Sequence, residues 1–239
     1  MIFDLYEKAA REARFVSTLL GVGLRMRSLS PEGSFTVADA IEKSMAADPG
    51  RAAIHFQGRA ISYRELDVAA NRTARFAKRV GIAKGDVVAL LMENRPEFLF
   101  TWLGLAKIGA TTALINTNLT GFPLAHSLRV SGAKHLLLGA ELAESYATAE
   151  GDLEEKPTVW TTGGDGGNLD SALAAETDAP IGADARAGLK ASEPLFYIYT
   201  SGTTGLPKAA RFSHFRFLST ANAAAAITGI TADDRMYVA

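Results

Sequence analysis

Residues 197–210 read YIYTSGTTGLPKAA, and this stretch decides the fold that we expect for the chain. It holds two glycines, four serine or threonine hydroxyls and a single lysine, and an apolar run leads into it. Glycine lets the backbone take positive φ and approach a ligand closely. Successive backbone N–H groups in such a loop form a concave anion site, and a lysine adds a point charge that suits polyphosphate. The stretch therefore predicts a phosphate-binding loop.

The candidate binding residues extend from the end of the apolar run to the lysine. They are Tyr199, Thr200, Ser201, Gly202, Thr203, Thr204, Gly205 and Lys208. The segment is no Walker loop, because Ala209 follows the lysine where Ser or Thr would stand and the next residues are typical of a strand. The alternative is a Gly/Thr-rich hairpin turn. A turn needs only two to five residues, so four hydroxyls and a lysine favour phosphate binding.

Upstream of this loop, apolar runs alternate with amphipathic segments. Residues 87–92 form a continuous apolar run, as in a strand that is buried on both faces. Further strands are expected at residues 111–115, 135–138 and 158–160, with helices at 63–80, 96–109, 123–130 and 141–149 between or before them. This alternation predicts an α/β fold with a mostly parallel sheet, right-handed crossovers and helices on both faces.

Three parts of the chain differ in pattern. We expect an N-terminal α/β subdomain at residues 1–160 and a loose connection at 161–191, where the sequence GGDGG lacks the spacing of a dinucleotide fingerprint. Residues 192–239 are expected to begin a second sheet that carries the phosphate loop. Strands at 195–199 and 209–212 flank the loop there, a helix follows at 215–226, and another strand begins at residue 235.

Composition excludes several classes of protein. The 239 residues include 25 basic and 26 acidic side chains and no cysteine, so neither nucleic acid binding nor disulfide or thiolate chemistry is expected. The first residues lack the basic and apolar pattern of a signal peptide, which predicts a cytoplasmic protein that is not secreted. Residues 5–20 have helical spacing and predict a helix docked on the body. The alternative is a basic amphipathic helix in peripheral contact with a membrane.

Histidines give no metal site. His55, His126, His135 and His214 are the only ones, and none is paired at the three- or four-residue spacing of a helical site. The first three are interpreted as surface or packing residues. His214 lies just beyond the second strand of the loop region, where it could approach a nucleotide, although packing is the favoured interpretation. We therefore predict no metal ligand in this chain.

Residues 200–208, TSGTTGLPK, closely resemble the signature loop of the adenylate-forming enzymes, which include acyl-CoA synthetases, luciferases and peptide-synthetase adenylation domains. The family usually has Gly after the lysine, where this chain has Ala209. The block ENRPEFLFTWLGLAKIGATTALINTNL at residues 93–119 and the form GLPKAA are similar to the fatty acid transport protein and very-long-chain acyl-CoA synthetase branch. GRAISYREL at residues 58–66 also fits the superfamily, so the resemblance covers nearly the whole chain.

The resemblance implies an ATP-dependent fatty acyl-CoA ligase that uses Mg²⁺, ATP, a fatty acid and coenzyme A. In such enzymes the loop closes on the β- and γ-phosphates while a carboxylate attacks the α-phosphate. Their adenine, ribose and carboxylate-contacting motifs lie further downstream, so this chain is expected to be an N-terminal part without a catalytic residue of its own and inactive alone. The alternatives are a ligase for an aryl or short-chain acid, and a non-catalytic nucleotide-binding fragment.

Overall fold

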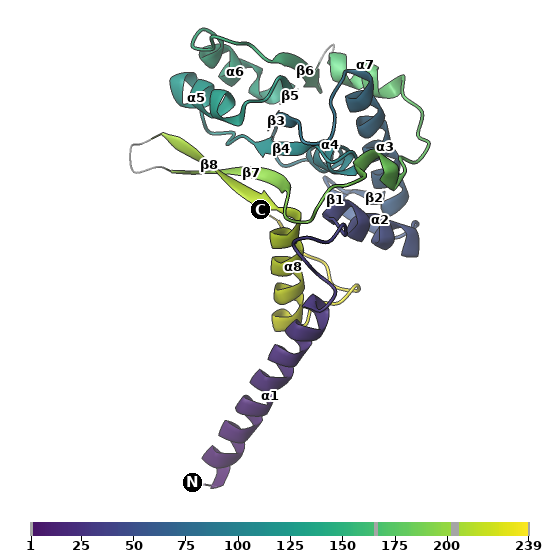
Figure 1. Ribbon diagram of the computed structural model, residues 1–239, viewed down its shortest axis with the longest axis vertical. Coiled ribbons are helices and arrows are strands. Elements are labelled where there is room, and N and C mark those ends of the chain that lie inside the picture. The colour runs from purple at the N-terminus through teal and green to yellow at the C-terminus, as the bar shows by residue number, and fades with distance from the viewer. Residues whose placement is uncertain (1, 165–166, 202–205, 239) are drawn as a thin grey trace.

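The computed structural model describes residues 2–164, 167–201 and 206–238. Within them a six-stranded sheet has the strand order β6-β5-β3-β4-β7-β8, and Figure 1 shows it in the upper part of the molecule. Every neighbouring pair is parallel except β7 and β8, which are antiparallel. The mostly parallel sheet is therefore confirmed. The strands are β3 (Val87–Leu91), β4 (Thr111–Leu114), β5 (His135–Gly139), β6 (Thr158–Thr162), β7 (Pro194–Ser201) and β8 (Pro207–Ser213).

Helices cover both faces of the sheet, as the alternating pattern predicts. Leu90 and Leu137 belong to one apolar cluster together with helices α3 and α4, whereas Leu91 and Leu138 belong to a second cluster with α5 and α6. Neighbouring residues of one strand point to opposite faces, which explains why these strands are apolar throughout. The helices are α2 (Val37–Ala47), α3 (Tyr63–Arg79), α4 (Pro96–Lys107), α5 (Gly121–Ser131), α6 (Ala143–Glu150) and α7 (Asn168–Ala174), with the 3₁₀ turns η1 (Ala140–Leu142) and η2 (Ala183–Arg186).

Local sequence fixes where α3 begins and how closely it packs. A small antiparallel pair, β1 (Ala52–Phe56) and β2 (Arg59–Ser62), leads into it. The Ser62 hydroxyl accepts from the Glu65 N–H, and the Glu65 carboxylate accepts from the Ser62 N–H, which forms a capping box. In α4, a Cβ atom at Gly104 would lie 2.6 Å from the Ala70 carbonyl oxygen of α3. Glycine therefore lets the two helices touch at that level.

The prediction of a second sheet is wrong. Strand β7 pairs in parallel with β4, with Thr112 opposite Phe196, so the strands on either side of the phosphate loop extend the main sheet. The paired residues of β4 and β7 are separated by more than 80 positions, and no local pattern reveals such a pairing. The strand expected from residue 235 is also absent from the described part of the chain, since residues 235–238 pair with no strand.

The described residues of the connection, 161–164 and 167–191, pack against the body instead of being loose. It contains α7 and η2, and the side chains of Leu169, Arg186 and Leu189 are buried. Its many Ala, Asp and Gly residues predict weak packing, but a few apolar side chains and one paired arginine are enough to hold the segment.

Two long helices extend from this layered body, and only the start of α8 is buried in it. α1 (Ile2–Met26) packs along α8 (His214–Thr228), and Figure 1 shows α1 extending away from the sheet. The sequence predicts docking through an apolar stripe that includes Val16 and Leu20, but both side chains are exposed, so docking through that stripe is wrong. No helix among the described residues is both long enough and apolar enough to span a membrane.

Candidate phosphate site at the end of the sheet

The structure brings both ends of the predicted loop together at one end of the sheet. Thr200 of β7 lies opposite Lys208 of β8, and Ser201 lies opposite Pro207. These residues were expected in a loop, but they continue the two strands, because antiparallel pairing extends as far as the backbone allows. Gly202, Thr203, Thr204 and Gly205 lie outside the described residues. The strand ends therefore carry the described part of the candidate site.

The two faces of this hairpin have different surroundings. Tyr197 and Tyr199 pack against the apolar cluster that includes α5 and α6. On the opposite face, Phe196 makes an edge-on contact with Trp102 at 5.1 Å between ring centroids. Ile198 is 37% exposed on that face, and strand alternation places Thr200 and Lys208 on the same side. The end of the hairpin thus has one covered face and one open face, and the open face carries Lys208.

Tyr199 serves mainly to attach the hairpin to α5. Its hydroxyl donates a hydrogen bond to the Ser127 carbonyl oxygen at 3.0 Å. Burial raises the pKa of Tyr199 to about 12, so the phenol stays protonated and remains a donor. Its hydroxyl is directed into the covered face, on the side away from Thr200 and Lys208.

His126 holds the other strand of the hairpin, and sequence reasoning missed this role. Its Nε2 atom lies 3.2 Å from the Pro207 carbonyl oxygen, and its Nδ1 atom lies 3.4 Å from Nη2 of Arg129. The partner is 81 residues away in the sequence. The sequence alone shows only that His126 belongs to a predicted helix, and no local pattern indicates its contact with Pro207.

Lys208 is an exposed cation on the open face. Among the described residues it has no hydrogen-bond or ion-pair partner. A lysine that no carboxylate neutralises can approach an anion without first breaking an ion pair, which suits a polyphosphate. The residues present therefore fit the phosphates of ATP. In the described ranges no group of three or more His, Asp and Glu side chains is arranged to hold a metal ion, so we assign Mg²⁺ no ligand here.

His214 lies in the core, in agreement with the packing interpretation. The Val37 N–H donates to its Nδ1 atom at 3.3 Å, and the side chain is fully buried. The proton is therefore on Nε2, which has no partner within the described residues. Burial lowers the pKa of His214 to about 4, so the ring is neutral near pH 7. It joins the start of α8 to the start of α2.

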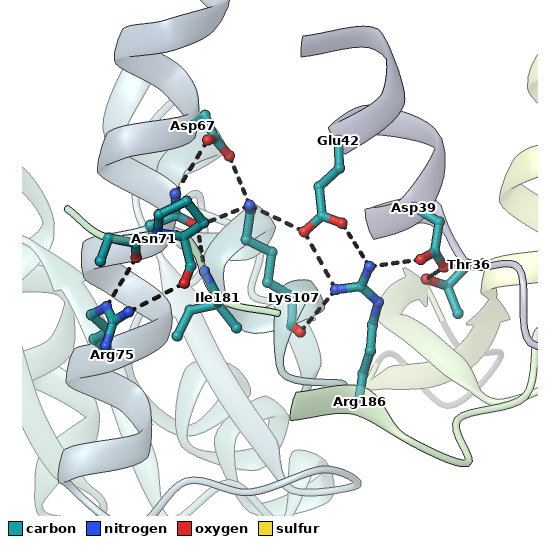
Figure 2. Close-up of polar contacts among 11 residues, drawn as sticks. Thr36, Asp39, Glu42, Asp67, Asn71, Arg75, Lys107, Ile181 and Arg186 are labelled. Atoms are coloured by element: carbon teal, nitrogen blue, oxygen red, sulfur yellow. Dashed lines mark hydrogen bonds and ion pairs between the residues drawn. The ribbon is translucent and has the colours of Figure 1, made fainter. Parts of the chain in front are cut away.

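A buried network of charges, also missed by sequence reasoning, lies elsewhere in the body (Figure 2). At its centre are Lys107 and Arg186, whose side chains are each 4% exposed. Figure 2 shows that their side-chain partners come from α2 and α3, while Lys107 belongs to α4 and Arg186 to η2 in the connection after α7. The contacts are Lys107 to Asp67 (2.7 Å), to Asn71 (2.9 Å) and to Glu42 (3.1 Å), and Arg186 to Asp39 (2.6 Å) and to Glu42 (2.7 Å).

The pKa shifts in this network agree with complete pairing. Burial alone would raise the pKa of Asp39, but hydrogen bonds from Arg186 and Thr36 lower it below its usual value. Burial likewise opposes the charge of Arg186, while its bonds to Glu42 and Asp39 raise the pKa. Asp39 and Arg186 therefore both stay ionised at neutral pH. The network therefore connects α2, α3, α4 and the connection, and it offers no free charge to a ligand.

Comparison with known families bears on this geometry. The sequence profile of the family described as "AMP-binding enzyme" matches residues 41–239, which is most of the chain and includes both strands of the hairpin. The chain belongs to the AMP-binding enzyme family. The resemblance to adenylate-forming enzymes is thereby confirmed.

Relatives and solved structures refine this assignment. Long-chain fatty acid transport protein 1 of Bos taurus is 39% identical over 221 residues, which cover 88% of this chain and 34% of the relative. This member of the AMP-binding family thus spans about a third of the length of the curated relatives that it matches. A fatty acyl CoA synthetase of Mycobacterium tuberculosis is 30% identical with a TM-score of 0.63, covering 75% of this chain and 34% of its own.

A more distant structure supports the fold. A long-chain-fatty-acid-CoA ligase of Archaeoglobus fulgidus has a TM-score of 0.74 and 21% identity, and it covers 85% of this chain and 41% of its own. At that identity the likeness concerns the fold alone. It confirms the α/β architecture expected for the N-terminal subdomain of an adenylate-forming enzyme.

Proposed function

We propose that this chain is the N-terminal part of an ATP-dependent long- or very-long-chain fatty acyl-CoA ligase. The observation that carries the proposal is the exposed Lys208, which has no partner among the described residues and lies opposite Thr200 at the end of the sheet, in a region that the AMP-binding profile matches. The substrate class follows from the relatives, which are named long-chain fatty acid transport proteins and fatty acyl CoA synthetases. ATP, Mg²⁺, coenzyme A and a fatty acid are the proposed reactants of the whole protein.

The proposed first step is acyl-adenylate formation. A carboxylate oxygen of the fatty acid bonds to the α-phosphorus of ATP, the bond from that phosphorus to the bridging oxygen breaks, and pyrophosphate leaves. Negative charge grows on the leaving group, so a fixed cation beside it lowers the barrier. Lys208 is assigned that position, and Thr200, Ser201 and residues 202–205 are assigned the remaining phosphate contacts. The adenylate then passes its acyl group to the coenzyme A thiol.

Pyrophosphate exchange tests the proposal. The complete reading frame would be assayed with ATP, Mg²⁺ and labelled pyrophosphate in the presence of fatty acids of graded length, together with benzoate and anthranilate. We expect exchange that depends on a long-chain acid. Exchange with the aryl acids alone would favour the alternative aryl-acid ligase. ATP binding without exchange for any acid would favour a non-catalytic nucleotide-binding protein.

A further inference from the structure

Helix α5 holds both strands of the hairpin, from one side, at the end next to the loop. Tyr199 of β7 is bonded to the Ser127 carbonyl, and the Pro207 carbonyl of β8 is bonded to His126, the neighbouring residue of the same helix. Strand β8 is the last strand of the sheet in the described part of the chain, so no described strand pairs with its outer edge. One helix therefore sets the position of both strands close to Lys208.

The contact at Pro207 controls the backbone of the next residue. Proline has no N–H, so its carbonyl is the only main-chain group at that position that can be bonded. The Pro207 carbonyl oxygen and the Lys208 nitrogen and Cα belong to one planar peptide unit. A hydrogen bond that fixes the direction of the carbonyl therefore also fixes where the Cα atom of Lys208 lies.

Geometry also determines the form of the imidazole. A carbonyl oxygen only accepts, so Nε2 of His126 must carry the proton that it donates to Pro207. A guanidinium only donates, so Nδ1 must be free to accept from Arg129. Both contacts together require the neutral Nε2–H form. Arg129 is itself held with its guanidinium carbon 5.8 Å from the ring centroid of Phe122, on the same helix.

We propose that His126 is a positioning residue for phosphate binding: in its neutral Nε2–H form it holds the Pro207 carbonyl and thereby sets the place of Lys208. Arg129 keeps the ring in that form. The inference rests on the proposed function for its catalytic consequence, but the anchoring itself is a property of the fold. It adds a residue that touches no substrate to the group that controls ATP use.

Two substitutions at His126 separate anchoring from general packing. His126→Gln places an amide N–H near the Nε2 position and keeps a donor for Pro207. His126→Asn places its amide near the Nδ1 position, about one bond short, and loses that donor although it is equally polar. His55→Asn, at an exposed histidine of β1, is the matched control for the same chemical change away from the hairpin.

Kinetics on the complete reading frame give the first readout. For His126→Asn we expect kcat/KM for ATP in pyrophosphate exchange to fall about three- to tenfold, the effect of one partly exposed hydrogen bond. The KM for the fatty acid should stay unchanged. The kcat/KM for ATP of His126→Gln should lie within about twofold of the wild-type value, and that of His55→Asn should equal it. Equal losses for Asn and Gln, or a loss shared by the fatty-acid KM, would overturn the proposal.

Hydrogen exchange on the same proteins gives a readout that needs no activity. Amides of residues 206 and 208–212 should exchange about three- to tenfold faster in His126→Asn than in the wild type, while His126→Gln should stay close to the wild type. Nitrogen chemical shifts of the His126 ring should report a protonated Nε2. A wild type that exchanges no pyrophosphate would refute the proposed function alone. Unchanged amide exchange in His126→Asn, or a proton on Nδ1, would refute the anchoring whatever the activity.

Discussion

Two parts of the molecule carry buried or clustered polar groups, and they use charge in opposite ways. In the network of Figure 2, Lys107 and Arg186 are almost fully buried and each is paired with two carboxylates. At the hairpin end, Lys208 is exposed and unpaired among the described residues. A paired cation in the interior fixes how elements pack, because breaking the pair leaves an uncompensated charge. An unpaired cation at the surface contributes little to folding and is free to meet an anion.

The largest expected effect on stability is in the buried network. Arg186→Met keeps most of the side-chain volume but leaves Asp39 and Glu42 without their shared guanidinium. Removing one partner of a buried ion pair costs about 3–5 kcal/mol. We expect the free energy of unfolding, measured in urea, to fall by that amount at pH 7.

Lys190→Met is the matched control for this loss of a cation. Lys190 pairs with Glu32 at 2.6 Å, but both side chains are more than half exposed. Exposed ion pairs contribute about 1 kcal/mol or less, so this variant should be nearly as stable as the wild type. If the two variants lost equal stability, burial would not be what distinguishes the Arg186 pairs.

A somewhat smaller effect is expected from pH at His214. The folded-state pKa is lowered to about 4 from an unfolded value of 6.5, so the unfolded chain takes up the proton first as pH falls. Stability is therefore complete above pH 6.5 and is lost as pH falls toward 4, by about 3 kcal/mol in total. Asp39, whose pKa is lowered from 3.8, adds its own loss only below that window.

His214→Asn removes the titrating group and keeps an acceptor for the Val37 N–H. The variant should be less stable at every pH, because it leaves a cavity, but its unfolding free energy should vary less between pH 6.5 and 4.5. Urea unfolding of both proteins across this range provides the comparison. Identical slopes for the two would mean that another group controls the acid sensitivity.

Next in size is the contact between α3 and α4. Gly104→Ala would place Cβ 2.6 Å from the Ala70 carbonyl and 2.5 Å from the Thr73 Cβ, so the helices must move apart. Overpacking costs about 1–3 kcal/mol, which outweighs the gain of about 1 kcal/mol from helix propensity. Gly23→Ala in α1 has open space around it and should be neutral or stabilising. Thermal unfolding of both variants tests whether the sign reverses.

Local patterns predicted the elements well, while contacts between distant residues could not be predicted. The apolar run at residues 87–92 predicted its strand and the pattern at residues 63–80 predicted its helix, because local residues determine both elements. Arg186 pairs with residues about 145 positions away, and its segment looked loose because nothing near it shows where its charge will be neutralised. The TSGTTGLPK stretch predicts phosphate binding, but it does not predict that α5 holds the strand ends at Tyr199 and Pro207.

The smallest effect on stability is expected at Lys208, where the effect on activity should be the largest. Lys208→Ala removes an exposed side chain without a partner in the described part of the chain, and such changes alter stability by about 0.5 kcal/mol or less. Loss of one fixed charge donor beside a developing anion lowers rates by about 10²- to 10³-fold, so pyrophosphate exchange by the complete reading frame should fall by that order.

Lys43→Ala, at an exposed lysine of α2, should leave both the stability and the exchange rate unchanged. Lys208→Arg should recover part of the rate, because charge is restored while the compact ammonium geometry is not. Undiminished exchange in Lys208→Ala would remove this residue from the phosphate site, and a large loss of stability would mean that its charge is paired, like that of Arg186, and not kept free for a ligand.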